Sequence, residues 1–460
     1  MPPARRPRVS SRLPSTSSAA AADGRGGKGW LSTLRRDPAK RPRRADDEGT
    51  PLNDEVLLVI FAGVHNLADL VRCAATCRRW RRLVSTEAAF LCRTPRLVPA
   101  RFIGPLALGF FHHRVDAAPG FVAMASALRR FPGLLQDPPP SLGALDDNGL
   151  FDGSSRIVAA RNGLLVVDIR HGKQNRALKL CVCNPMTGEV HVLPPLAGKD
   201  GLGHYSCTVL TAEDRDDKTT DPPPPPSYFR LVMVYTRRGF TAFRSYSSDE
   251  GSWSEEAKVT GSRLGKKQMD LTHSGVVSRD GKLVYWMAKN VVLVLSLNKL
   301  QSMLGSMPRS GNGQIFDMKN TLLGLSPKGR LCAVQFDPLP VPARMKADRI
   351  SIRITNCTTD RRWFDEIESI QVGQSLPDDV ISLKLKWFCS KSGIVFFTAV
   401  AGDSGHQRRE VYALNLNTRV VEKLACHDGV GDPWEGLHGY EMDQVVYLAS
   451  LAEPDSLEDM

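Results

Sequence analysis

With 460 residues and 42% hydrophobic side chains, the chain is long enough to form two or three domains with a sizeable core. No stretch approaches the ~18 consecutive apolar residues of a membrane-spanning helix, and the first residues lack the apolar core of a signal peptide. We therefore expect an intracellular protein with no membrane partner. The ten cysteines are scattered, which predicts reduced and mostly buried thiols instead of a disulfide framework.

The formal net charge of +12 belongs mainly to one end of the chain. Residues 1–44 contain twelve Lys or Arg and only two acids, Asp23 and Asp37, so they account for ten of these charges. The rest of the chain is close to neutral. A basic fold that binds phosphate is not indicated, and we do not expect nucleic acid as a partner of the folded part. One functional class that stays open is a nuclear protein that the basic end tethers to nucleic acid.

The first 49 residues are rich in Arg, Ser, Pro, Ala and Gly and have almost no large apolar side chains. Such a segment cannot bury enough surface to offset its ordering entropy, so residues 1–49 are predicted to form a disordered basic tail. Its candidate nuclear-import signal consists of Lys40, Arg41, Arg43 and Arg44. A solvated basic linker and an organellar transit peptide are the alternatives. The expected location is the nucleus, the cytoplasm or both.

Residues 50–95 are predicted to form three short helices. In the first, Val56, Leu57, Ile60 and Phe61 fall on one helical face, and Asn53 or Asp54 is placed to cap it. The second is expected over about Ala68–Thr76 and the third over about Arg78–Val84, where Trp80 stands among arginines. A unit this small makes a poor core alone, so the sequence indicates half of an interface.

From residue 151 to 460 the sequence predicts a β domain, with 96–150 as a linker and the start of that domain. Asp280-Gly281, Lys328-Gly329 and Ser392-Gly393 each separate two strand-like runs, as in a hairpin. No amphipathic helices alternate with the runs, which argues against a parallel α/β sheet. The predicted strands are Gly163–Ile169, Leu178–Cys183, Tyr228–Tyr235, Val276–Val277, Leu283–Met287, Val291–Leu297, Leu322–Leu325, Leu331–Phe336, Ile350–Ile354, Leu383–Phe388, Ile394–Val400, Val411–Leu416 and Val445–Leu448.

A degenerate repeat runs through this region. The turn Asn184–Glu189 joins one strand to Val190–Leu193, Leu414–Arg419 precedes Val420–Leu424 in the same manner, and Leu295–Leu300 is a looser instance. Strand–turn–strand units at such spacing are typical of a β-propeller, and the length leaves room for six to eight blades. The predicted fold class is thus α+β multidomain: a small three-helix unit followed by an all-β, kelch-like propeller. Pro222–Pro226 is predicted to lie in an exposed loop.

Several blocks in the first folded segment together resemble an F-box. They are Leu52–Leu57, Ile60-Phe61, Leu67–Arg72, Cys77–Val84 and Phe90-Leu91. The region after Arg101 resembles the propeller-like F-box-associated domains of plant proteins, notably those of grasses, through Gly163–Leu165 and Cys183–Gly188. An F-box usually has Pro at the position of Asn53 and Leu-Pro at Val64-His65. Asn53 is a suitable helix cap in place of Pro, whereas His65 has no such compensation.

The resemblance implies that the chain docks on a Skp-type adaptor, and through it on a cullin, as the substrate-recognition subunit of a ubiquitin ligase. The protein substrate bound by the β domain is not identified by the sequence. The alternative is a propeller-type interaction module that acts outside a ubiquitin ligase. The residues expected to bind the adaptor are Leu52, Val56, Leu57, Ile60, Leu70, Val71 and Trp80, with packing inside the helical unit as the competing role.

The sequence predicts no catalytic residues, no metal site and no cofactor. Cys181 and Cys183 have the wrong spacing for a zinc knuckle and are interpreted as strand cysteines. Asp365, Glu366 and Glu368 are assigned to a solvated loop. Five tryptophans of the β domain have two open roles, substrate contact or core packing: Trp253, Trp286, Trp363, Trp387 and Trp434.

Overall fold

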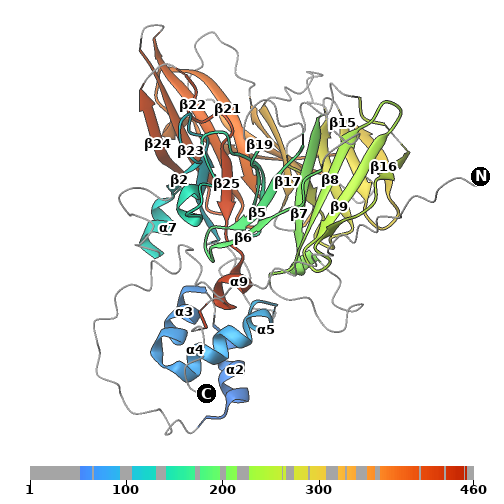
Figure 1. Cartoon of the computed structure of the whole chain (residues 1–460). Helices are drawn as coiled ribbons and strands as arrows, with labels where there is room; N and C mark the ends of the chain where they lie inside the picture. Colours follow the sequence, from blue (N-terminus) through green and yellow to red (C-terminus); the bar gives the residue numbers. More distant parts are fainter. Residues whose placement is uncertain are drawn as a thin grey trace, which may run out of the picture.

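A computed structural model shows a small helical region below a β-propeller, joined by the C-terminal helix (Figure 1). It describes residues 52–452, apart from 65–66, 94–105, 131–140, 171–176, 197–203, 215–226, 262, 266–273, 289–290, 307–319, 327–328, 338–349, 358–362, 404–405, 429–430 and 450. The basic tail with Lys40 to Arg44, His65 and Pro222–Pro226 lie outside these residues.

The helical region contains four helices within the described residues, one more than the sequence predicts. They are α2 (Asp54–Ala62), α3 (Leu67–Thr76), α4 (Arg78–Thr86) and α5 (Ala88–Arg93). The Asn53 side chain accepts a hydrogen bond of 2.8 Å from the Val56 amide, which confirms the predicted cap of α2. Only Glu87 separates α4 from α5, which is too short an interruption to mark a new helix in the sequence.

The β domain is a six-bladed propeller in the described part of the chain. Five blades follow the chain in order, and the sixth combines both ends of the domain. The blades are β3 (Arg156–Arg161), β4 (Leu164–Asp168), β5 (Leu180–Asn184) and β6 (Glu189–Val192); β7 (Tyr205–Thr211), β8 (Phe229–Thr236), β9 (Thr241–Ser247), β10 (Ser252–Trp253) and β11 (Ala257–Lys258); β12 (Thr260–Gly261), β13 (Val276–Val277), β14 (Leu283–Ala288), β15 (Val291–Ser296) and β16 (Gln301–Ser306); β17 (Thr321–Leu325), β18 (Leu331–Asp337), β19 (Ser351–Cys357) and β20 (Trp363–Gln371); β21 (Val380–Cys389), β22 (Ile394–Asp403), β23 (His406–Asn415) and β24 (Val421–Asp428); and β1 (Ala107–His112), β2 (Gly120–Ala123) and β25 (His438–Glu441).

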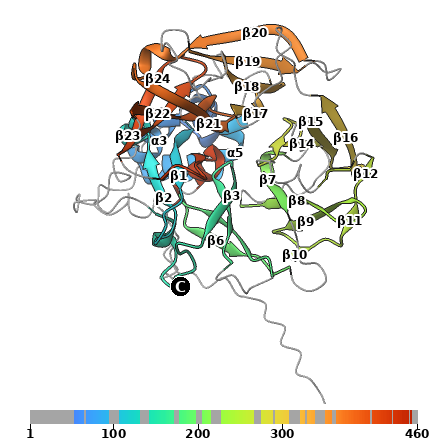
Figure 2. The same ribbon diagram turned by 90° about the horizontal axis from the view of Figure 1, so that it is seen from above.

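The innermost strands follow one another around the ring in the order β25, β3, β7, β13, β17, β21, and β21 lies next to β25 again. Figure 2 shows the blades arranged around a common centre, which we call the central channel. In the closing blade, β25 pairs with β1, with Phe110 opposite Gly439. The end of the domain thus supplies the inner strand, and its beginning supplies the two outer ones. A short helix, α7 (Ala125–Arg130), follows β2, and 3-10 turns occur at Leu142–Leu145, Ala212–Asp214 and Gly373–Ser375.

The three predicted hairpin turns are confirmed. Gly281, Gly329 and Gly393 each lie between paired strands of one blade and have φ of 66°, 74° and 66°, a conformation that glycine adopts without strain. The degenerate repeat found in the sequence corresponds to one kind of turn in the blades. Its three instances are the turns β5–β6, β15–β16 and β23–β24, and each joins the third strand of a blade to the outer fourth strand.

Two local predictions are wrong. Val445–Leu448 is not a strand but part of helix α9 (Gln444–Ala449), whose first turn is capped by Asp443 through a 3.0 Å hydrogen bond from the Val446 amide. A four-residue apolar run fits a buried strand as well as a buried helix. Asp365, Glu366 and Glu368 belong to strand β20 and not to a loop, and Glu368 pairs with Arg419 at 3.1 Å.

Helix α9 follows β25 directly and packs against α4 and α5 (Figure 1). Val445, Tyr447 and Leu448 are buried in one hydrophobic cluster that runs from Leu57 of α2 to Phe110 of β1. A single continuous core therefore connects the helical region with the closing blade, and the two parts are placed relative to one another by packing.

Candidate functional site

One face of α2 exposes an apolar stripe at the end of the molecule remote from the propeller (Figure 1). The side chains of Leu52, Val56, Val59 and Ile60 are 40%, 43%, 71% and 50% exposed. Val56, Val59 and Ile60 follow the i, i+3, i+4 spacing of one helical face, and Leu52 lies one turn earlier. We call these four residues the α2 stripe. Exposed apolar side chains that share one helical face form a candidate contact site.

The other predicted adaptor residues lie differently. Leu57 and Leu70 are 1% and 0% exposed and belong to the chain's own core, which is the competing role that the sequence left open. Val71 and Trp80 are half-buried, and Trp80 packs edge-to-face on Phe61 with the ring centroids 5.3 Å apart. The structure thus brings Leu52, Val56 and Ile60 together on the surface and keeps Leu57 and Leu70 inside.

Val59, the most exposed residue of the stripe, is missing from the sequence prediction. The signal was present, since it stands three residues after Val56. The α2 stripe is held in place by Arg79 of α4. Its guanidinium forms an ion pair with Asp54 at 2.8 Å and donates a 2.8 Å hydrogen bond to the Leu52 carbonyl. These contacts fix the start of α2 on the helical region.

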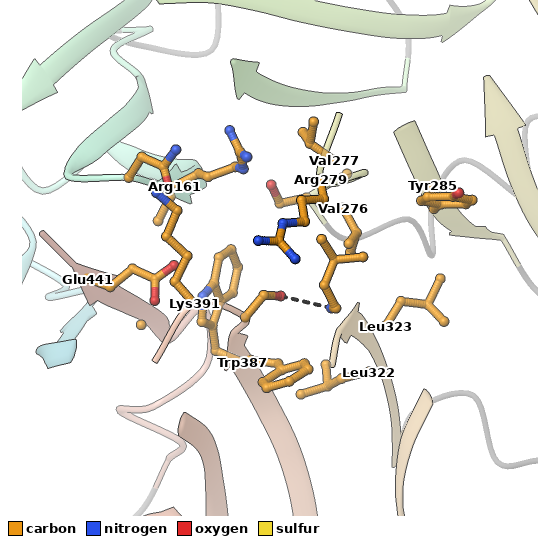
Figure 3. A pocket seen from close by; sticks show the side chains of 18 of the residues that line it. Arg161, Val276, Val277, Arg279, Tyr285, Leu322, Leu323, Trp387, Lys391 and Glu441 are labelled. Carbon is orange, nitrogen blue, oxygen red and sulfur yellow. Dashed lines mark hydrogen bonds between the residues drawn. The ribbon is translucent and has the colours of Figure 1, made fainter. Parts of the chain in front are cut away.

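A second candidate site is a cavity of about 410 Å³ in the central channel. Its apolar wall includes Val276, Leu322, Leu323 and Trp387 (Figure 3). Ends of inner strands close to α9 contribute polar groups, and Gln444, the first residue of α9, also lines the cavity. The volume lies in the usual range of ligand pockets. Sequence reasoning named only Trp387 from this wall, because the cavity is assembled from residues of six blades.

Three of the four cationic side chains that line the cavity are paired. Arg161 forms an ion pair with Asp214 at 2.5 Å, and Lys386 contacts Asp432 at 3.2 Å. Lys391 pairs with Glu213. Burial alone would raise the pKa of Asp214, but the Arg161 guanidinium outweighs it and holds that pKa below its ordinary value. These pairs keep the charges of the cavity wall fixed.

Asp443, the cap of α9, lies beside this ion-pair network. Burial, followed by the negative charge of Glu213, raises the pKa of its carboxyl from the ordinary 3.8 to about 6, while Lys391 acts in the opposite direction. The carboxyl is 5% exposed. The joint between propeller and helical region therefore contains an acid that titrates near neutral pH.

The five tryptophans divide between the two open roles. Trp286 and Trp434 are buried, and Trp253 and Trp363 are half-buried in the packing of their blades. Trp253 also donates a 2.8 Å hydrogen bond to the Pro194 carbonyl. Among the five, Trp387 is the residue that lines the cavity. Of these five tryptophans, Trp387 therefore stays the candidate for ligand contact in the cavity.

The described residues contain no group of three or more His, Cys, Asp or Glu side chains arranged to hold a metal ion. Cys181 and Cys183 are buried in β5, in agreement with their interpretation as strand cysteines. In the described part of the chain, no helix is both long and apolar enough to span a membrane.

Comparison with protein-family models matches residues 54–93 to F-box-like. This range coincides with helices α2 to α5. The chain therefore carries an F-box-like domain, followed by the six-bladed propeller. The comparison with curated proteins gives no match.

Comparison with solved structures gives distant similarities. They include an oligogalacturonate lyase in complex with manganese (9% identity, TM-score 0.24, 43% of this chain and 62% of that one), dipeptidyl peptidase 4 of Porphyromonas gingivalis (12%, 0.27, 60% and 40%) and the α-L-arabinofuranosidase Arb93A of Fusarium graminearum with an iminosugar inhibitor (10%, 0.33, 74% and 87%). The chain spans less than two thirds of the first two. At such TM-scores these similarities carry no argument about function.

Proposed function

We propose that this chain is the substrate-recognition subunit of a Skp/cullin/F-box ubiquitin ligase. The F-box-like domain binds the Skp-type adaptor, and the propeller binds a protein substrate. In this role the chain is non-catalytic. It raises the effective concentration of the substrate near the enzyme that carries ubiquitin.

The observation that supports this proposal most directly is the α2 stripe within the F-box-like domain. Val56, Val59 and Ile60 of α2, and Leu52 just before it, are exposed. Helix α2 lies at the end of the molecule farthest from the propeller (Figure 1). An adaptor that covers them gains about 25 cal/mol for each Å² of apolar surface removed from water. The propeller stays free to hold a substrate on the other side of the joint.

The test is co-purification of the full chain with a plant Skp-type adaptor. We expect the double variant Val59→Asp, Ile60→Asp to lose adaptor binding by about a hundredfold or more, because two carboxylates would be buried without partners. Both side chains are at least half exposed, so the fold should tolerate the change. Val115→Asp, an exposed valine of the propeller at 82% exposure, is the matched control and should bind like the wild type.

An interaction module that works outside a ligase is the second candidate. It is favoured if the folded wild-type chain does not bind the adaptor at all. Equal adaptor binding by the wild type and the double variant would instead show that the α2 stripe is not the docking surface, and the first proposal would then lose its main support.

A further inference from the structure

Arg279 forms a cationic pole in the central cavity. It follows β13, in the hairpin that leads to β14, and its guanidinium points into the cavity (Figure 3). Within the described residues, it has no carboxylate in ion-pair distance, in contrast to Arg161, Lys386 and Lys391. The side chain is exposed, so its guanidinium is accessible to an anion that enters the cavity and attracts it.

The opposite side of the channel carries hydrogen-bond acceptors on Asn162, Gln444 and Glu441, which we call the acceptor pole. Asn162 at the end of β3 is 1% exposed; its Nδ2 donates to the Thr211 hydroxyl at 2.9 Å, but its Oδ1 has no donor among the described residues. The buried Oε1 of Gln444 likewise accepts no hydrogen bond from the described residues. Glu441 of β25 accepts from the Ser392 amide and hydroxyl and is in no ion pair among the described residues, although Arg161 interacts with it electrostatically. Buried acceptors of this kind are stabilised by an N–H or O–H donor.

The order of the inner strands places these poles across the channel from one another. Around the ring, β25 stands three positions from β13, which is the largest separation that six strands allow. Arg161 pairs with Asp214 and Lys391 with Glu213, so Glu441 is the carboxylate of the cavity lining that stays outside the ion pairs of the described residues. Between the poles lie Leu322, Leu323 and the Trp387 ring (Figure 3).

We propose that the central cavity binds a ligand group that carries a carboxylate beside an N–H donor. Its carboxylate pairs with Arg279, its ammonium or N–H donor meets Glu441, Asn162 and Gln444, and its apolar body lies against Leu322, Leu323 and Trp387. A free amino acid carries an ammonium beside its carboxylate, and the free carboxyl end of a peptide carries a backbone N–H in that place. The inference rests on the proposed function in one respect, namely that the group arrives as part of a protein substrate.

Three probes distinguish the sources of this chemistry. They are a pool of random hexapeptides with free carboxyl ends, the same pool with amidated ends, and a mixture of the twenty free amino acids. Each is incubated with the full chain, and the bound fraction is recovered and quantified by mass spectrometry. We expect free-ended peptides to be retained at least about tenfold over the amidated pool, because a charge-assisted pair is replaced by a neutral contact.

The decisive variant is Arg279→Gln, with Arg129→Gln on α7 as the matched control. Both arginines are exposed, so neither change should affect folding. Arg279→Gln should abolish the preference for a free carboxylate, and Arg129→Gln should retain it. Retention of the amino acids with the same dependence on Arg279 would support the cavity chemistry and assign the ligand to a small molecule. Equal retention of the free and amidated pools by the wild type, without Arg279-dependent binding of amino acids, would overturn the proposal.

A further variant tests the acceptor pole. Asn162 has a φ of 49°, in the left-handed region that glycine tolerates, so Asn162→Gly removes Oδ1 without backbone strain. It should weaken retention of the same peptides severalfold and leave the preference for a free carboxylate intact. Adaptor binding is measured in parallel and should be unchanged in all of these variants. Failure of adaptor docking with intact peptide binding would count against the ligase function alone.

Discussion

At the scale of single residues, Asp443 links electrostatics to the joint between the two parts of the chain. Its carboxyl caps α9 through the Val446 amide, yet it is buried near Glu213. Because the folded-state pKa is raised above the ordinary value, the folded state holds a proton between about pH 4 and 6 that the unfolded chain has lost. The ionised carboxyl therefore costs stability above about pH 6.

We expect Asp443→Asn to raise the free energy of unfolding at pH 7, by at most about 3 kcal/mol, since each pKa unit corresponds to about 1.4 kcal/mol. Asn caps a helix about as well as Asp. The advantage of the variant should shrink as the pH falls from 6 to 4, because the folded wild type takes up a proton on Asp443 in this range while the unfolded chain does not. Denaturant titrations at pH 4.5 and 7 measure the difference in free energy of unfolding between the variant and the wild type. A difference that does not depend on pH would contradict the titration of Asp443.

Glycines on the inner strands determine how closely neighbouring blades approach. A Cβ at Gly324 of β17 would lie 1.9 Å from the Phe388 ring of β21, so the ring contacts the bare backbone. We expect Gly324→Ala to lower the free energy of unfolding by about 1–3 kcal/mol through overpacking. Gly305→Ala on the outer strand β16 is the control, because its nearest neighbour would be 3.8 Å away. Thermal unfolding of both variants checks this, and equal melting temperatures would show that the ring moves freely.

At the scale of elements, α9 decides how the F-box-like domain sits on the propeller. It is only six residues long, but three of its side chains are buried between the closing blade and helices α4 and α5. Such a short helix has little stability of its own, so its packing holds it in place. The orientation of the α2 stripe relative to the central cavity depends on this joint.

Leu448→Ala should therefore lower the free energy of unfolding by about 2–5 kcal/mol, the usual cost of a cavity at a fully buried leucine. It should also speed amide hydrogen exchange in α4 and α5 more than in the blades far from the joint. Val446→Ala, at a half-buried position of the same helix, is the control and should have a smaller effect. Uniform exchange changes throughout the chain would argue against a local joint.

At the scale of the whole molecule, the two candidate sites share one structural element. The α2 stripe belongs to the helical region that α9 supports, and Gln444 of α9 lines the central cavity. A ligand in the cavity would thus be held on the channel wall that leads directly into the joint. In the proposed ligase, this arrangement gives the substrate a defined position relative to the adaptor.

Helix caps and turns could be predicted from the sequence, because residues close together in the chain determine them. Asn53 predicts its own helix cap, and Gly281, Gly329 and Gly393 mark their turns, because these effects act within a few residues. The turn Asn184–Glu189 and its two relatives predicted the propeller, since each blade repeats the same path. The resemblance to an F-box rests on motif residues such as the block Cys77–Val84, and the match to F-box-like over residues 54–93 confirms it.

Only the tertiary structure decided what depends on residues far apart in the chain. Val445–Leu448 has the composition of a strand, and its contacts with α4 and α5 make it a helix. Leu57 and Val59 are equally apolar, yet one is buried and the other exposed, because the packing of four helices selects the inner face. The cavity brings Arg279 opposite Glu441, which stands 162 positions later, and closure of the ring is the physical reason.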